Sequence, residues 1–423
     1  MDGIESHRLL LRARGIAAFQ GVLSSEAGRS FLALLELLAA ERSDSTAIAD
    51  VCARIWGELA VAPEPLLEDG WQSHLVERIL EDEHPFALAA EQGRLNPLLL
   101  EQARRDLHTL RALFDLDAKT LIRAVEEFVP ETSGLWVSPP HRVSAQHTSS
   151  RRTLANKLAE AEDWGELVES LAEYYALHGA WPFGLYRAFR WEKGGLRGVV
   201  SPDPVRLEAL IGYERERGPL LRNTERFLAG LPCHHALLYG VPDTGKSSTV
   251  KAILNKYADK GLKLVELAKG DLKELPAALD ALRDRGPRFI LFVDDLSFEE
   301  HEVEYKSLKA LLEGSVEEPP ENIRLYATSN RRNLIREHFS ERDETNDVHA
   351  RDTIQEKLSL AARFGLRLTL PAPDRKRYLE IVAGLVRERG IKSRKENCAR
   401  GLSYGIAGMQ EGAAVPPTSS WMS

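Results

Sequence analysis

The sequence predicts an α/β core with a five-stranded parallel sheet, preceded by a large all-α N-terminal region. Apolar residues recur at helical spacing from Ser6 to about Phe128, with few β-branched runs. From His235 onward, short runs that are apolar on both faces alternate with helical segments, as the strands of a buried parallel sheet do. These five runs are HALLY (235–239), KLVEL (263–267), RFILFVDD (288–295), IRLYATSN (323–330) and LRLTL (366–370).

The chain divides into five segments by composition and periodicity. With 423 residues, of which 43% are hydrophobic, it is long enough to bury more than one core. The segments are a helical N-terminal domain (1–129), a linker rich in Ser, Thr and Pro (130–152), a helical and aromatic connecting segment (153–201), the α/β core (202–391) and a tail without helical periodicity (392–423). The aromatic and basic run from Trp181 to Trp191 is compatible with base or headgroup stacking, but docking between domains is the favoured interpretation.

Charge and cysteine content restrict the class of protein. The net charge is −8 and the pI is near 5.9, so no overall positive field attracts nucleic acid, and such contact would require a local patch. Cys52, Cys233 and Cys398 are far apart and lack metal-ligand spacing, which favours free thiols in a reducing compartment. The N-terminus is acidic where a signal peptide is basic, and no stretch reaches the roughly eighteen apolar residues of a membrane span. We expect a cytoplasmic protein without membrane contact.

A phosphate-binding loop follows the first of these apolar runs. The ten residues GVPDTGKSST (240–249) fit the pattern of Gly, four residues, Gly-Lys-Ser between a strand and a helix. In such a loop, glycines let successive N–H groups point at phosphate, and the following helix directs its positive end at the same anion. The alternative is an ordinary glycine-rich turn. The residues expected to bind nucleotide are Gly240, Val241, Pro242, Asp243, Thr244, Gly245, Lys246, Ser247 and Ser248.

Three positions of this loop have distinct expected roles. Lys246 supplies a charge to the β- and γ-phosphates, and the Ser247 hydroxyl is the expected Mg²⁺ ligand. Asp243 brings a carboxylate towards the phosphates. Its side chain tolerates a left-handed backbone, so the loop is expected to close, but repulsion is expected to weaken nucleotide binding.

Two carboxylates end the apolar run Phe289–Val293. Asp294 is expected to reach Mg²⁺, and Asp295 to polarise the attacking water. Paired acids also occur at strand ends as helix caps, which is the alternative for both residues.

Two further polar residues complete the predicted catalytic set. Asn330 follows the next strand, where an amide beside the γ-phosphate can position water and report on that phosphate; ordinary turn chemistry is the alternative. Arg363 comes just before the last strand, where an arginine reaches the γ-phosphate of a neighbouring subunit in ring-forming ATPases; a local salt bridge is the alternative.

Taken in order, these motifs resemble the AAA+ ATPases, and the segment around Arg363 resembles the arginine-finger element of the DnaA and loader group. The strings LEALIGYERERGPLLRNTERFLAG, FVDDLSFEEHEVEYKSLKALLEGSVE and YATSNRRNL are similar to the bacterial DUF815 family, from about Pro202 to about Ile391. The resemblance implies ATP binding by Gly240, Gly245, Lys246 and Ser247, magnesium at Asp294 and sensing at Asn330. Where that family has a small helical lid, this chain has the atypical tail from 392 to 423, which we interpret as a frameshift product.

The leading functional hypothesis is a Mg²⁺-dependent ATPase that acts as a homo-oligomer, with the arginine supplied in trans, to remodel or load a protein or nucleic-acid client. The main alternative is a binding scaffold that holds ATP with little turnover. A DNA loader is a third hypothesis, against which the acidic net charge counts.

Overall fold

The computed structural model describes residues 3–40, 44–61, 65–136, 149–296, 308, 311–312, 320–330 and 363–388. The chain forms two compact units. Unit 1 comprises residues 1–187 together with 258–261 and 284–287, and unit 2 comprises the remainder. The predicted tail (392–423) and Cys398 lie outside the described residues, as does most of the predicted linker. The segment boundaries expected from the sequence stay predictions.

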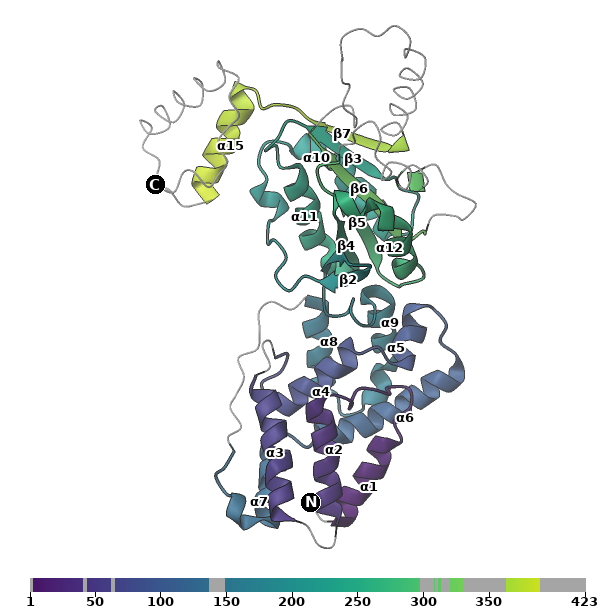
Figure 1. Ribbon diagram of the computed structural model, residues 1–423, viewed down its shortest axis with the longest axis vertical. Helices are drawn as coiled ribbons and strands as arrows, with labels where there is room; N and C mark the ends of the chain where they lie inside the picture. The colour runs from purple at the N-terminus through teal and green to yellow at the C-terminus, as the bar shows by residue number, and fades with distance from the viewer. Residues whose placement is uncertain are drawn as a thin grey trace. The chain divides into compact units, whose positions relative to one another are not determined.

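Unit 1 is all-helical in its described part (Figure 1). Its α-helices are α1 (Gly3–Arg14), α2 (Glu26–Ala39), α3 (Ser45–Ala60), α4 (Gly70–Glu81), α5 (Pro85–Glu91), α6 (Pro97–Phe114), α7 (Ala118–Phe128), α8 (Ser149–Glu160) and α9 (Val168–His178). Its 3₁₀ turns are Pro130–Thr132, Trp164–Leu167 and Ala258–Lys260. Within the described residues no helix is both long and apolar enough to cross a bilayer.

Polar side chains define where these helices begin. Asp69 Oδ1 accepts the N–H of Gln72 at the start of α4, and Asn96 Oδ1 accepts the N–H of Leu99 at the start of α6. Each cap satisfies a first-turn N–H group that has no partner inside the helix. The same device begins α2, α3 and α7, with Ser25, Asp44 and Asp117 as the caps.

The core of unit 1 is a continuous apolar cluster with a few satisfied polar groups. Phe31 stacks on Trp71 with ring centroids 4.1 Å apart, and the Trp71 indole N–H donates to the Leu113 carbonyl at 2.9 Å. Asp106 is buried, and its Oδ2 accepts three backbone N–H groups of residues 17–19. Because a buried charge needs such partners, Asp106 specifies how α6 packs on the turn after α1.

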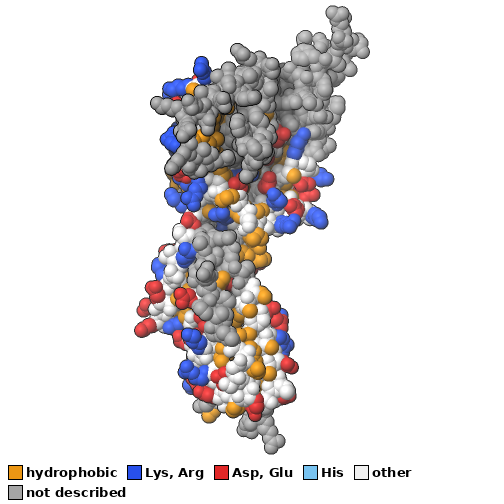
Figure 2. Space-filling view, turned by 90° about the vertical axis from the view of Figure 1, so that its left-hand side faces the viewer, with side chains coloured by type: hydrophobic (Ala, Val, Ile, Leu, Met, Phe, Trp, Pro, Cys, Tyr) orange, Lys and Arg blue, Asp and Glu red, His pale blue; other side chains and the backbone are white. Residues whose placement is uncertain are grey.

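On the face seen in Figure 2, acidic and basic side chains of this unit are interspersed.

Unit 2 contains one sheet of strand order β2-β1-β4-β5-β6-β3-β7. The strands are β1 (Ala188–Glu192), β2 (Gly195–Gly198), β3 (Ala236–Gly240), β4 (Leu262–Leu267), β5 (Arg288–Val293), β6 (Ile323–Ser329) and β7 (Leu366–Leu370). All neighbouring pairs are parallel except β1 with β2. Strands β3 to β7 coincide with the five predicted strands, which confirms the predicted α/β P-loop NTPase core.

The predicted number of strands is too low, because β1 and β2 extend the sheet from the aromatic segment. Phe189 and Trp191 are buried while Arg190 between them is exposed, which is the alternation of an amphipathic strand. The Trp191 indole N–H donates to Glu274 at 2.7 Å. The turn between the strands is Lys193-Gly194, and both residues have positive φ, as a tight hairpin requires. Phe189 and Trp191 therefore belong to the sheet, and the interpretation of the run from Trp181 as a docking surface stays a prediction.

The strand order places a crevice at the carboxyl end of β3. Strand β3 lies between β6 and β7, while the next strand in sequence, β4, lies on the far side of β5. Because parallel crossovers are right-handed, α11 (Lys246–Tyr257) and α12 (Leu275–Leu282) cover opposite faces of the sheet (Figure 1). Helices α10 (Glu214–Leu228) and α15 (Arg375–Glu388) complete the described part of unit 2. Ligands of open α/β sheets bind at such a switch of strand order.

Candidate functional site

The phosphate loop begins at Gly240, where only glycine fits. Gly240 has φ +154, and a Cβ there would lie 1.9 Å from the carbonyl oxygen of Leu370 on the neighbouring strand β7. The loop turns with positive φ at Asp243 (61°) and Gly245 (77°) and ends at Lys246, the first residue of α11. Positive φ favours glycine and is tolerated by aspartate. The loop therefore closes with Asp243 in a conformation that glycine would adopt without strain.

Backbone donors of the loop lack partners in the part of the chain that the structure describes. Among the described residues, no backbone N–H from 243 to 247 donates to another protein group. Thr244 is buried, and its hydroxyl donates to the Val241 carbonyl at 3.0 Å, which stabilises the curved conformation. A row of unsatisfied N–H groups at the start of a helix is a site for an anion.

Lys246 lies over this loop. Its side chain is buried, and Nζ donates to the carbonyls of Gly240 (3.1 Å) and Val241 (2.7 Å). Burial lowers the pKa of the Lys246 ammonium from its usual value, and nearby carboxylates oppose this shift. The carboxylates belong to Asp243, Asp295 and Asp294. A third Nζ proton remains for an anion in the loop.

Asp294 and Ser247 meet at the carboxyl ends of β5 and β3. Ser247 Oγ donates to Asp294 Oδ1 at 2.6 Å, although the two residues are 47 positions apart in the chain. Asp294 is exposed, and the hydrogen bonds that its carboxylate accepts from described residues all involve Oδ1. A hydroxyl and a carboxylate in contact, beside a phosphate-binding loop, suit Mg²⁺, which takes few protein ligands and fills its shell with phosphate and water.

Asp295 and Asn330 also come together. Asn330 Nδ2 donates to Asp295 Oδ1 at 2.8 Å, across the ends of β5 and β6. Asp295 has φ 50°, so its backbone is in the left-handed region that most residues avoid. Both side chains are exposed.

Arg363 comes just before the amino end of β7, whereas this group gathers at the carboxyl ends of the strands. It is exposed and lies three residues before β7, whose first residue, Leu366, is in register with Ala236 at the start of β3. The phosphate loop begins four residues later, at Gly240 opposite Leu370. At about 3.3 Å per residue, β7 alone separates Arg363 from the level of the loop by roughly 13 Å. Arg363 therefore lies near the amino ends of the parallel strands, whereas the phosphate loop lies at their carboxyl ends.

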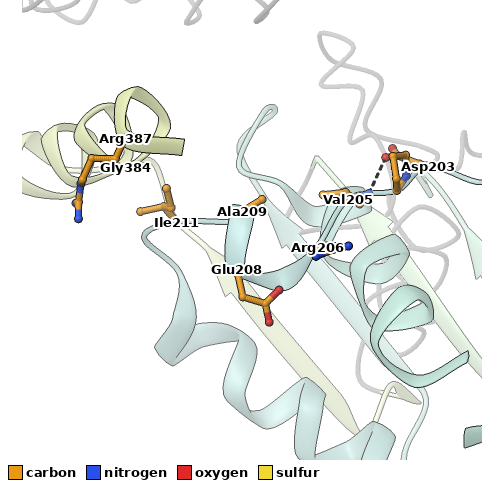
Figure 3. Close-up of a pocket in the computed structure, with 9 residues that line it drawn as sticks. Asp203, Val205, Arg206, Glu208, Ala209, Ile211, Gly384 and Arg387 are labelled. Atoms are coloured by element: carbon orange, nitrogen blue, oxygen red, sulfur yellow. Dashed lines mark hydrogen bonds between the residues drawn. The ribbon is translucent and has the colours of Figure 1, made fainter. Parts of the chain in front are cut away.

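A pocket of about 640 Å³ lies between residues 203–211 and α15 (Figure 3). Its lining comes from a segment before α10 and from α15: Asp203, Pro204, Val205, Arg206, Glu208, Ala209, Ile211, Gly384 and Arg387. Leu210, between two lining residues, places its Cδ2 3.9 Å from where a Cβ on Gly245 would be. Leu210, which does not itself line the pocket, thus lies near the loop.

Close packing holds α15 against this wall. A Cβ on Gly384 would lie 2.1 Å from Ile211 Cδ1, so the missing side chain makes room for Ile211. Arg377 pairs with Glu216 at 2.7 Å, and its guanidinium lies 4.6 Å from the centre of the Tyr213 ring. Sequence reasoning missed this pocket. The sequence signal for this close approach of α15 to the segment before α10 is a glycine on each side, Gly212 and Gly384. Gly212 also has φ +96, which favours glycine.

The sequence match assigns the chain to a family. Residues 184–407 match the family described as "Protein of unknown function (DUF815)", which is more than half of the chain. The chain belongs to the DUF815 family. The match extends further at both ends than the resemblance read from the sequence. No curated protein matches this DUF815 chain.

Solved structures of RuvB from Thermotoga maritima are similar to part of this DUF815 chain. One single-residue variant of RuvB is 20% identical, with a TM-score of 0.31, over 46% of this chain and 57% of that one. The structure titled Holliday junction branch migration motor is 21% identical, with a TM-score of 0.29, over 44% and 55% of the two chains. The similarity thus spans little more than half of the RuvB chains. Because these TM-scores are low, we assign the AAA+ type of P-loop fold from the strand order and the phosphate loop of this chain.

Proposed function

We propose that the chain binds Mg²⁺-ATP at the phosphate loop and hydrolyses it. The observation that carries the proposal is the contact between Ser247 and Asp294 at 2.6 Å, beside the buried Lys246. Free N–H groups, an ammonium and a hydroxyl–carboxylate pair then surround one anion site, which suits a polyphosphate with its metal. Bound Mg²⁺ would be held by Ser247 and Asp294 and would neutralise charge that develops on the phosphates.

The pocket of Figure 3 is proposed to take the nucleoside part of ATP. Leu210, which neighbours two lining residues in sequence, lies near Gly245 of the loop, and this proximity supports placing the sugar and base of a loop-bound triphosphate in the pocket. The lining combines four apolar side chains with four charged ones, of which two are acidic and two are basic, so it offers both a surface for a base and polar groups for a sugar.

Asp295 and Asn330 are proposed to prepare the attacking water. The Asp295 carboxylate accepts a hydrogen bond from the Asn330 amide, which orients its other oxygen for a water proton. Asn330 has a second N–H for the γ-phosphate or the water itself. This pairing lets the Asn330 amide bind both the Asp295 carboxylate and the γ-phosphate or the attacking water. The contacts of the amide therefore change when the γ-phosphate leaves.

Hydrolysis is proposed to require a second copy of the chain. Arg363 lies at the edge of the sheet opposite its own phosphate loop, so its guanidinium serves a neighbour's γ-phosphate, in the manner of the DnaA and loader arginine finger. Such a head-to-tail contact uses two different surfaces and closes into a ring or continues as a filament. The helical unit 1 is proposed to contact the client.

Steady-state ATP hydrolysis, measured across a range of chain concentrations, tests this function. We expect specific activity to rise with concentration and to fall by about 10³-fold or more in Arg363→Ala. Arg367→Ala is the matched control, because Arg367 is an exposed arginine in β7 near the same edge.

A mixing experiment tests the trans arrangement directly. Arg363→Ala keeps a complete phosphate loop, and Lys246→Ala keeps the arginine. If the two inactive variants restore activity when mixed, the arginine acts between chains; if the mixture stays inactive while wild type is active, that arrangement is wrong.

One observation favours the scaffold as second candidate. The exposed carboxylate of Asp243 lies in the loop, and Asp295 is one methylene shorter than glutamate, so both binding and water activation are weakened. Turnover per bound nucleotide separates the two functions: saturable ATP binding with no detectable hydrolysis at any concentration supports the scaffold.

A further inference from the structure

Thr328 links the carboxylate of Asp294 to the main chain of Asp295, and neither the motifs nor the fold assign it a role. It lies at the carboxyl end of β6, in register with Leu238 of β3, and is almost fully buried. Its Oγ1 is 2.5 Å from Asp294 Oδ1 and 2.9 Å from the backbone N of Asp295. One hydroxyl thus contacts both residues that end β5.

The direction of these two bonds is fixed by chemistry. The Asp295 N–H can only donate, so the Thr328 oxygen accepts from it. The hydroxyl proton is then free to point at the Asp294 carboxylate, which can only accept when it is ionised. A hydrogen bond to a charged acceptor is stronger than one between neutral groups. Thr328 therefore acts as an oriented bridge.

The bridge restrains side chain and main chain together. The Thr328 carbonyl also accepts the N–H of Leu296 at 2.7 Å, so β6 binds the chain on both sides of the left-handed residue Asp295. Without these bonds the Asp295 N–H retains only the longer contact of 3.2 Å to Asp294 Oδ1.

The bridge is also compatible with a metal at Asp294. Ser247 now donates to the same Oδ1, and a bound Mg²⁺ takes the Ser247 oxygen as a ligand, which ends that donation. The bond from Thr328 does not need to break, because Thr328 is buried behind the carboxylate. Groups that hydrogen-bond to a metal-binding side chain commonly set the orientation of that side chain.

We propose that Thr328 is a positioning residue that aims the Asp294 carboxylate at Mg²⁺ and holds the main chain of Asp295 in place. The role rests on the proposed function of the loop. Thr328 acts through Asp294 and Asp295 and does not touch the nucleotide.

The test compares Thr328→Val, which keeps the shape and removes the hydroxyl, with Thr328→Ser, which keeps the hydroxyl. A fluorescent ATP analogue is titrated in EDTA and at increasing Mg²⁺ concentration. We expect T328V to raise the half-saturating Mg²⁺ concentration about 10-fold or more while affinity in EDTA stays within about 2-fold. T328S is expected to remain close to wild type.

Thr224→Val is the matched control. Thr224 is likewise fully buried, and its hydroxyl bonds Leu220 O (2.9 Å) and Tyr326 Oη (2.8 Å), away from the site. It reproduces the stability cost of losing a buried hydroxyl without touching Asp294. Should T328V not fold, Thr328→Cys replaces it against T328S, since a thiol is a weak donor of similar size.

Each outcome decides something. An unchanged Mg²⁺ midpoint in T328V, or an equal rise in T224V, overturns the role of Thr328 while the function of the loop stands. A wild-type chain that binds no analogue with or without Mg²⁺ overturns the proposed function, and the role of Thr328 with it.

Discussion

Asp243 offers the sharpest test of the phosphate loop, because its backbone and its charge have separable effects. It is exposed and has φ 61°, a conformation that costs an ordinary L-residue about 1–2 kcal/mol and aspartate or asparagine less. Three substitutions separate the effects. Asp243→Asn removes the charge, Asp243→Gly removes charge and strain, and Asp243→Ala removes the charge but adds strain.

The expected magnitude follows from the position of the carboxylate beside the anion site. For a chosen separation of about 7 Å, two unit charges repel by about 0.6 kcal/mol at the dielectric constant of water and about 2 kcal/mol at an effective constant of 20. Removing the Asp243 charge should therefore tighten ATP binding by about 3- to 30-fold. We expect the affinity order Gly, then Asn, then Ala, with wild type weakest or equal to Ala.

Equilibrium binding of a fluorescent ATP analogue measures the effect at about 50 mM and about 500 mM salt, where screening differs strongly. The gap between Asp and Asn should shrink at the higher concentration. Asp284→Asn is the control, since Asp284 is also exposed and has φ 60°. It precedes the amino end of β5, whereas the loop lies at the carboxyl ends of the strands. The reasoning is refuted if D243N binds as wild type does at low salt, or if D284N changes the affinity equally.

Two further predictions concern stability. Gly240→Ala should destabilise unit 2 by about 3 kcal/mol or more, because the new Cβ would lie 1.9 Å from the Leu370 carbonyl oxygen. Gly270→Ala is the control, since a Cβ there would have no neighbour within 4 Å. Thermal unfolding compares the two variants, and equal melting temperatures would contradict the close approach of Gly240 to β7. Burial lowers the pKa of His84 to about 4, so the unfolded chain, with a usual value near 6.5, binds more protons below neutral pH. His84 should therefore cost about 2 kcal/mol of stability between pH 7 and pH 5. Urea unfolding should show a smaller loss over that range in His84→Asn, which keeps the capping role of this residue at α5, and an equal loss would exclude His84 as the cause.

Local spacing predicts those parts of the candidate site whose residues are close together in the sequence. The roles given to the loop from Gly240 to Ser248 and to the pair Asp294-Asp295 rest on short-range patterns of glycine, lysine and carboxylate residues, and they stay predictions. The five strands from 235 to 370 were found because buried parallel strands are apolar on both faces. Strands β1 and β2 were missed because each is short and its aromatic residues also suit an interface.

The rest depends on distances that the sequence does not contain. The sequence places Thr328 in an apolar strand, and only the register of β6 against β3 and β5 brings its hydroxyl between Asp294 and Asp295. The pocket was missed because its two walls, around residues 203–211 and 384–387, are far apart in the chain.

The sequence by itself thus determined the class of fold, the phosphate loop and the order of the strands along the chain, because periodicity and motif spacing are local properties. Only the tertiary structure decided which side chains meet. Sheet register brings Ser247, Asp294 and Thr328 together at the carboxyl ends of the strands and leaves Arg363 near the amino ends. The reason is that parallel strands all have their carboxyl ends on the same side of the sheet, whatever their separation in sequence.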